Sequence, residues 1–319
     1  MTSLTAHGLV VKSTGSWQTV LTDSGETIAC KVKGNLRLRG MRSTNPVAVG
    51  DGVTIVKRPT DEVAFISEID DRRNAIVRRS PNLSKQSHVL AANIDQAVLL
   101  FTVARPETTT TFADRFLAGA EAYGVPALIV FNKVDDLTAE ELQQLDALRH
   151  IYEAAGYSCY AISALHGTGI APLSEALSGK LTLLSVHSGS GKSTLLNTLV
   201  PEAHARTAPI SEVHGQGMHT TTFSTLYRLS DGGAIIDIPG IKGFGTYDFK
   251  PAEVCHYFRD IFAVSNACRY GGCTHTHEPG CAVRQAVQDN LIAPSRYASY
   301  LSMLGDEGES KYRKKALQR

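Results

Sequence analysis

Residues 188–194 read Ser188-Gly189-Ser190-Gly191-Lys192-Ser193-Thr194, between an apolar run at residues 181–186 and a helical pattern at residues 194–200. A glycine-rich turn between a strand and a helix lets the backbone curl around a phosphate with its amides pointing inward. The N-terminus of the helix favours the same negative charge. Lys192 would reach the β and γ phosphates, and the Ser193 hydroxyl would ligate Mg²⁺. The stretch therefore predicts a site for a nucleoside triphosphate.

The entry to this loop departs from the usual pattern. Phosphate-binding loops of this type begin with a glycine five residues before the glycine that precedes the lysine, and Val186 occupies that position. Because it leads into the loop and is not one of the innermost amides, we expect nucleotide binding to survive, with a changed affinity or rate. We also count His187, the next residue, among the expected nucleotide contacts.

A second motif indicates which base is bound. The tetrapeptide Asn132-Lys133-Val134-Asp135 follows an apolar strand pattern at residues 127–131, and ligands bind at the carboxyl ends of parallel strands. The Asp135 carboxylate can accept hydrogen bonds from N1 and N2 of guanine, whereas adenine offers no such pair, so an ATP-using enzyme is disfavoured. Asn132 and Lys133 would brace this loop and flank the base. Ser163 and Ala164, which follow a further strand pattern, are the expected contacts on the other side of the guanine.

Two more segments complete the expected Mg-nucleotide site. Asp237-Ile238-Pro239-Gly240 follows a strand pattern, and an aspartate in this place holds Mg²⁺ through water while the glycine amide senses the γ-phosphate. Upstream, residues 217–222 end in threonines whose hydroxyls could fill another metal position, and either Thr221 or Thr222 fits.

The group that positions the attacking water is less obvious. Many GTPases carry a glutamine after the glycine of this aspartate motif, but here that residue is Ile241. His219, beside the threonines, is the best candidate in the sequence. We therefore expect slow intrinsic turnover that depends on a partner.

The motifs occur in a rotated order. Ordinary small GTPases present the phosphate loop first and the asparagine-lysine and serine-alanine motifs last, whereas here the last two come first. Strand and helix patterns alternate between residues 97 and 238, which predicts a parallel sheet with helices on both faces.

The N-terminal part has a different pattern. Five β-rich segments separated by turn signals predict a small barrel of the oligonucleotide-binding (OB) type, although an SH3-like barrel would look similar; they are residues 9–11, 17–21, 27–32, 53–57 and 63–69. Five cations and no acid lie between residues 31 and 42, namely Lys31, Lys33, Arg37, Arg39 and Arg42. Such a stretch can contact RNA phosphates.

A cluster of metal-binding residue types lies near the C-terminus. Cys268, Cys273, His275 and Cys281 offer three thiolates and one imidazole, the donor set of a closed tetrahedral zinc site. His277 is an alternative fourth ligand. We expect a structural zinc ion that stabilises a small helical domain.

Composition excludes several other classes. The 319 residues carry a net charge of only +1, no stretch resembles a secretory signal, and no apolar run is long enough to span a membrane. The six cysteines do not form a disulfide framework. We therefore expect a cytoplasmic protein without a membrane partner.

Together these motifs resemble the circularly permuted GTPase family RsgA, also called YjeQ, the small-ribosomal-subunit-dependent GTPase A. The resemblance covers nearly the whole chain, and residues 82–86 and 91–95 are similar to the family's lead-in to its GTPase domain. It implies an OB-type RNA-binding barrel at residues 1–72, a circularly permuted α/β GTPase domain at 73–246 and an α-helical zinc-binding domain at 247–319.

The resemblance also implies a function. GTP would be hydrolysed to GDP with Mg²⁺ bound, under stimulation by the small ribosomal subunit and its rRNA, late in the maturation of that subunit. In the family the switch histidine is proposed to act in hydrolysis, which corresponds to His219. We expect a monomer. The alternative is a GTP-gated rRNA-binding assembly factor in which hydrolysis is vestigial because of Val186 and Ile241.

Overall fold

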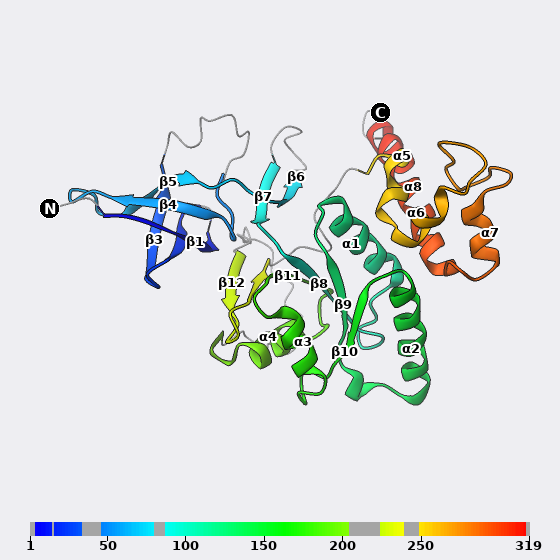
Figure 1. Cartoon of the computed structure of the whole chain (residues 1–319), viewed down its shortest axis with the longest axis horizontal. Helices are drawn as coiled ribbons and strands as arrows, with labels where there is room; N and C mark the ends of the chain where they lie inside the picture. The colour runs from blue at the N-terminus through cyan, green and yellow to red at the C-terminus, as the bar shows by residue number, and fades with distance from the viewer. Residues whose placement is uncertain are drawn as a thin grey trace.

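The computed structural model describes residues 4–14, 16–33, 46–79, 87–203, 224–238 and 249–316, without the side chains of residues 78, 79, 87, 88, 203 and 306–316. Along the longest axis of the molecule a small β-barrel is followed by a sheet flanked by helices, and then by a group of helices that ends the described chain (Figure 1).

The N-terminal strands form the barrel. They are β1 (Leu4–Ser13), β2 (Gln18–Thr22), β3 (Thr27–Val32), β4 (Gly52–Lys57) and β5 (Ala64–Ile69). Their order is β1–β2–β3–β5–β4, and β4 pairs back to β1, which closes the barrel. Alternate residues such as Val53 and Ile55 are fully buried in its core, as the period of two predicts. The expected OB-type barrel is confirmed.

The central sheet has the parallel strands that the sequence predicts. These are β8 (Gln96–Phe101), β9 (Ala127–Phe131), β10 (Ser158–Ala161), β11 (Leu181–Val186) and β13 (Ala234–Asp237). They lie in the order β10–β9–β8–β11–β13 and are parallel to one another. The flanking helices are α1 (Thr110–Ala122), α2 (Ala139–Ala154), α3 (Ile170–Leu177) and α4 (Lys192–Leu199).

Both faces of this sheet are buried, which explains its continuous apolar strands. In β8, Leu99 packs into the core beneath α1 and α2, while Val98 and Leu100 pack on the opposite face beneath α3 and α4. Helix α2 begins with the predicted capping box, in which the Thr138 hydroxyl accepts from the Glu141 amide and the Glu141 carboxylate accepts from the Thr138 amide.

Two elements at the junction with the barrel were not expected from the sequence. Strand β12 (Ser224–Arg228) runs antiparallel to β13 and also pairs with β1, so the barrel and the central sheet share one eleven-stranded sheet. A separate hairpin is formed by β6 (Ala75–Arg79) and β7 (Ser87–Ala92).

The C-terminal part is helical, as expected. Its elements are α5 (Pro251–Val254), the 3-10 turn η4 (Cys255–Tyr257), α6 (Arg259–Ser265), α7 (Ala282–Gln288) and α8 (Pro294–Ala316). Phe258, Ile261 and Tyr300 form its core together with Ala118 of α1, so these helices pack directly on the central domain. No helix in the described residues is both long and apolar enough to cross a membrane.

Candidate nucleotide site and metal centre

Four of the expected nucleotide motifs lie at the ends of neighbouring parallel strands. Asn132 follows β9, Ser163 follows β10 and the phosphate loop follows β11, while Asp237 ends β13. Because the carboxyl ends of parallel strands share one edge of a sheet, segments that lie far apart in the chain meet there. The structure therefore brings these motifs together in spite of their rotated order.

The phosphate loop depends on its glycines. Gly189 and Gly191 have φ angles of +85° and +93°, in the left-handed region that favours glycine. A Cβ atom on Gly191 would lie 2.5 Å from Nδ2 of Asn132. Gly191 is thus required both by its backbone conformation and by the close approach of the neighbouring loop.

Asn132 joins three loops of the site. Its side-chain amide donates to the carbonyl oxygen of Ser190 at 2.8 Å, and its side-chain oxygen accepts from the backbone amide of Ala164 at 3.0 Å. The residue is buried, and it holds the phosphate loop and the serine-alanine loop against its own loop. This is the bracing role that the sequence predicts.

The Asp135 carboxylate lies at the surface of this arrangement and is set up to be charged. A hydrogen bond from Ser163, which is itself buried, is the main cause that lowers the pKa of Asp135. Nε2 of His166 lies 3.6 Å from its Oδ2 atom. A fixed, ionised carboxylate is what the recognition of two guanine N–H groups requires.

A second ionic contact lies at the other end of the phosphate loop. Nζ of Lys192 is 2.7 Å from both carboxylate oxygens of Asp237. The sequence assigns this lysine to a phosphate and this aspartate to a metal. An anionic phosphate would complement Lys192, and a cationic metal would complement Asp237. A bound Mg-nucleotide could therefore lie between these two side chains and replace their direct contact.

A cavity of about 350 Å³ lies among these loops. It is lined by Asn132, Lys133, Asp135, Asp136, Ala164, Leu165, Gly191 and Thr194. Its volume lies in the range typical of small-ligand sites. The guanine motif and the phosphate loop thus line one cavity, as the sequence predicts.

Other predicted site residues are not among those that line the cavity. Ser188 and Ser193 belong to the phosphate loop and the first turn of α4, and the ring of His187 packs edge-on against Phe112 of α1 at 5.8 Å. His219, Thr221, Thr222 and Gly240 lie outside the described residues.

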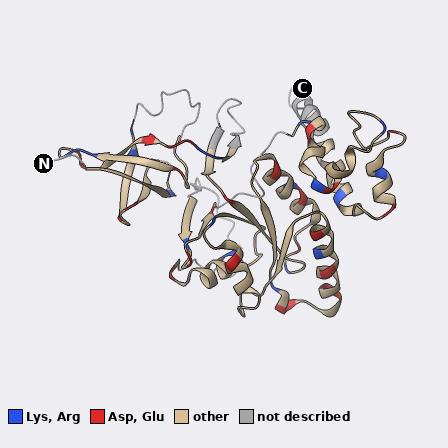
Figure 2. Ribbon diagram, viewed as in Figure 1, with Lys and Arg blue, Asp and Glu red and all other residues tan. Residues whose placement is uncertain are grey.

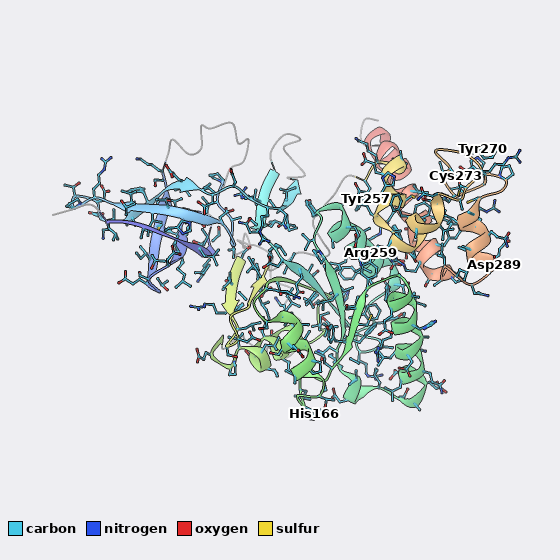
Figure 3. The ribbon with its side chains drawn as sticks, viewed as in Figure 1. His166, Tyr257, Arg259, Tyr270, Cys273 and Asp289 are labelled. Carbon is cyan, nitrogen blue, oxygen red and sulfur yellow. The ribbon has the colours of Figure 1, made fainter. Side chains whose placement is uncertain are left out.

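Sequence reasoning missed two neighbours of this site. His166 follows the serine-alanine motif at the edge of the domain (Figure 3) and faces Asp135. Arg105 lies in the loop after β8. Its carbonyl group accepts from Lys133 of the guanine motif, and its side chain contacts Asp136 directly after that motif. The sequence offered one indication of Arg105, namely its place in a loop that follows the carboxyl end of a parallel strand, where ligands bind.

The predicted zinc ligands converge near the far end of the C-terminal part, where Figure 3 labels Cys273. One ligand atom from each of Cys268, Cys273, His275 and Cys281 lies within 4.8 Å of the others. Sγ of Cys268 is 3.9 Å from Sγ of Cys281, and both sulfurs are 3.5 Å from Nδ1 of His275. His277 is not in this group.

These separations fit a tetrahedral zinc ion. With Zn–S near 2.3 Å and Zn–N near 2.0 Å, tetrahedral angles place two sulfurs about 3.8 Å apart and a sulfur and nitrogen about 3.5 Å apart. Burial raises the pKa of the Cys273 thiol to about 12 when no metal is bound, and a coordinated cation reverses this by stabilising the thiolate. The four residues could therefore hold zinc with no open position.

Helix α8 supports the metal-binding loop. The Tyr297 hydroxyl donates to the carbonyl oxygen of His275 at 2.6 Å, and the Tyr300 hydroxyl donates to that of Thr274 at 2.9 Å. These bonds fix the peptide groups on either side of His275, which itself has a φ of +60°. Such outer contacts orient metal ligands.

Family models match most of the chain. The model of the RsgA N-terminal domain matches residues 7–66, and that of the RsgA GTPase matches residues 69–247. A protein of Bacteroides fragilis named small ribosomal subunit biogenesis GTPase RsgA is 59% identical over 306 residues, covering 96% of this chain and 98% of that protein. The RsgA 2 protein of Bacteroides thetaiotaomicron is 58% identical over the same length, with the same coverage.

Solved structures give the same assignment of fold. YjeQ from Thermotoga maritima superposes with a TM-score of 0.76 at 32% identity, covering 95% of this chain and 98% of that one. YloQ, described as a circularly permuted GTPase, gives a TM-score of 0.73 at 27% identity, covering 96% of both chains. The rotated order of motifs is therefore that of a circularly permuted GTPase.

Proposed function

The chain belongs to the RsgA GTPase family of GTP-hydrolysing enzymes, and from this premise we propose that it hydrolyses GTP to GDP and phosphate on the small ribosomal subunit, late in the maturation of that particle. Its relatives in Bacteroides are named small ribosomal subunit biogenesis GTPases. The structural observation that carries the nucleotide part is the cavity shared by Asp135 of the guanine motif and Gly191 of the phosphate loop.

Each side of the cavity has its own role in this mechanism. Asp135 accepts from guanine, and Lys133 flanks the base. The phosphate loop binds the phosphates through its amides and Lys192. Ser193, Asp237 and either Thr221 or Thr222 would hold Mg²⁺, which would supply positive charge beside the transferred phosphoryl group.

Positioning of the attacking water is assigned to His219. Ile241 has no polar group, and the family resemblance places the switch histidine at this step. Because no glutamine stands after Gly240, the subunit would supply or fix part of the catalytic arrangement, much as activating proteins do for other GTPases.

The barrel and the C-terminal part are proposed to hold the protein on RNA as a monomer in the cytoplasm. We place the domain boundaries at residues 72 and 246, supported by the ranges of the two family models. On the barrel, Nζ of Lys31 lies 4.6 Å from the ring centre of Trp17, which presents a cation and an aromatic face together. Elsewhere in the described chain basic and acidic residues are interspersed, with acids recurring along α2 (Figure 2).

Turnover of GTP, measured by phosphate release with and without purified small subunits, tests this proposal. Subunits should raise kcat by a factor on the order of 10² or more, because they complete a catalytic arrangement that the free chain lacks. Lys192→Ala should abolish the stimulated rate and provides the background. Turnover that does not increase when subunits are added would contradict the proposed role. If GTP nevertheless strengthens binding of the protein to the subunits, the alternative of an assembly factor with vestigial hydrolysis would be favoured.

For the metal centre we propose structural zinc bound by Cys268, Cys273, His275 and Cys281. Cys273→Ser should reduce zinc from about one ion per chain to near zero after dialysis against a chelator, and should unfold the C-terminal part, because zinc binding and folding are coupled in such small sites. Zinc is measured by mass spectrometry and folding by circular dichroism. The matched control is Cys255→Ser, which removes a thiol of the same part that lies outside the cluster. A folded Cys273→Ser variant with stoichiometric zinc would exclude this ligand set.

A further inference from the structure

The loop that follows β8 lies against both nucleotide loops. It contains Arg105 and Pro106, and Cγ and Cδ of Pro106 lie 3.3 Å from where a Cβ atom on Gly189 would stand. The phosphate loop therefore packs against this proline. Arg105 has a φ of +50°, a conformation that non-glycine residues adopt when their surroundings impose it. Contacts with neighbouring residues therefore hold Arg105 in this conformation.

The side chain of Arg105 is anchored to the segment that follows the guanine motif. Its Nε atom donates to Oδ2 of Asp136 at 2.8 Å, and its two terminal nitrogens donate to the carboxylate of Glu141 at 2.8 and 2.7 Å. One of them also donates to the carbonyl oxygen of Asp136. The bidentate contact with Glu141 fixes the direction of the guanidinium as well as its position.

The backbone of Arg105 completes the connection. Its carbonyl oxygen accepts a hydrogen bond from Nζ of Lys133 at 2.6 Å. Lys133 lines the cavity beside Asp135 and itself has a left-handed φ of +65°. The Lys133 side chain is therefore held at the cavity by the Arg105 carbonyl group. The position of that carbonyl group is in turn fixed by the ion pairs of the Arg105 guanidinium.

Helix α2 does not need Arg105 in order to form. The Glu141 carboxylate already accepts from the Thr138 amide at 2.8 Å, as the capping box requires. The Arg105 side chain is 46% exposed, and ion pairs this exposed contribute little to the stability of a fold. The network is better suited to hold one loop in place than to stabilise the fold.

We propose that Arg105 is a positioning residue for the guanine subsite, which fixes Lys133 so that the base cavity is preformed. This rests on the proposed GTP site. GTP and GDP share the base, so the contacts that Arg105 makes stabilise both complexes equally. Their loss should therefore raise KM and Kd and leave kcat unchanged.

The experiment compares Arg105→Ala with wild type in binding of a fluorescent GDP analogue and in GTP turnover. We expect Kd and KM to rise about tenfold, in line with the loss of charge-assisted bonds that orient a binding group, while kcat at saturating GTP changes less than about twofold. Arg105→Lys should be intermediate, because lysine keeps the charge but cannot form the bidentate contact.

The control and a double-mutant cycle separate positioning from general damage. Arg149→Ala removes an arginine of α2 whose partner, Glu153, lies on the same helix, and it should bind GDP as wild type does. If Arg105 acts through Lys133, adding Arg105→Ala to Lys133→Ala should weaken GDP binding no further.

The outcomes are distinct. Additive losses in the cycle, or an Arg105→Ala variant that binds GDP as tightly as Arg149→Ala, would overturn the inference while leaving the GTP site intact. Loss of kcat at unchanged KM would overturn it as well. Failure of the wild-type chain to bind GDP would remove the proposed function, and the inference with it.

Discussion

Asp135→Asn should shift the preference of the enzyme from GTP to xanthosine triphosphate. The carboxylate can accept from both N1 and N2 of guanine, whereas an asparagine amide offers one acceptor and one donor and matches a base with an oxygen at position 2. Charge-assisted hydrogen bonds contribute about 1.5–3 kcal/mol each. We therefore expect kcat/KM for GTP to fall by a factor on the order of 10² to 10⁴.

The measurement is kcat/KM for GTP and for xanthosine triphosphate with each variant, in the presence of small subunits. Asp146→Asn, on the exposed side of α2, makes the same chemical change away from the cavity and should leave both values unchanged. The hydrogen bond from Ser163 lowers the pKa of Asp135, so the carboxylate is ionised at neutral pH. Protonation of Asp135 therefore does not affect the comparison of the two enzymes. An Asp135→Asn variant that still prefers GTP would show that another group reads the base.

The sequence was sufficient to predict the central sheet because most of its strands, in contrast to β10, are largely buried. A run such as that of β8, in which residues of both faces are apolar, can only be a buried strand or a short buried helix, and the polar motifs after each run distinguish the two. The convergence of those motifs at one edge followed from parallel strand order alone. The sequence alone therefore assigns Asn132, Asp135 and Gly191 to one site.

The unpredicted features depend on contacts between distant segments. Strand β12 pairs with β13 and with β1, which are separated by most of the chain, and no local pattern specifies such pairing. Arg105 was missed for a related reason, because its role comes from partners 28 to 36 residues further along the chain. The switch residues His219, Thr221 and Thr222 lie outside the described chain, so their assignment stays a prediction.

A buried arginine connects the C-terminal part to the central domain. The Arg296 side chain of α8 is only 1% exposed. It donates at 2.7 Å to Asp114 of α1 and at 2.7 and 3.0 Å to Asp260 of α6. Its guanidinium lies 4.9 Å from the ring centre of Phe258. Arg259, which Figure 3 shows at the same junction, adds a second link through Glu121 of α1.

Arg296→Ala is expected to destabilise the protein by about 3–5 kcal/mol, because it leaves the Asp114 and Asp260 carboxylates without their buried counter-charge. The measurement is the free energy of unfolding by denaturant at neutral pH. Arg149→Ala, which breaks an exposed ion pair on α2, is the control and should change that free energy by less than about 1 kcal/mol.

The pH dependence of this variant separates lost charge pairing from lost packing. Burial already raises the pKa of Asp114 in the intact protein, and removal of the neighbouring cation should raise it further. A carboxyl whose pKa is higher in the folded state destabilises the fold progressively as pH rises through the range between its two pKa values. The difference in unfolding free energy between Arg296→Ala and wild type should therefore be smaller at pH 5 than at pH 8. An equal difference at both pH values would mean that Arg296 acts through packing against its aromatic neighbours and not through its charge.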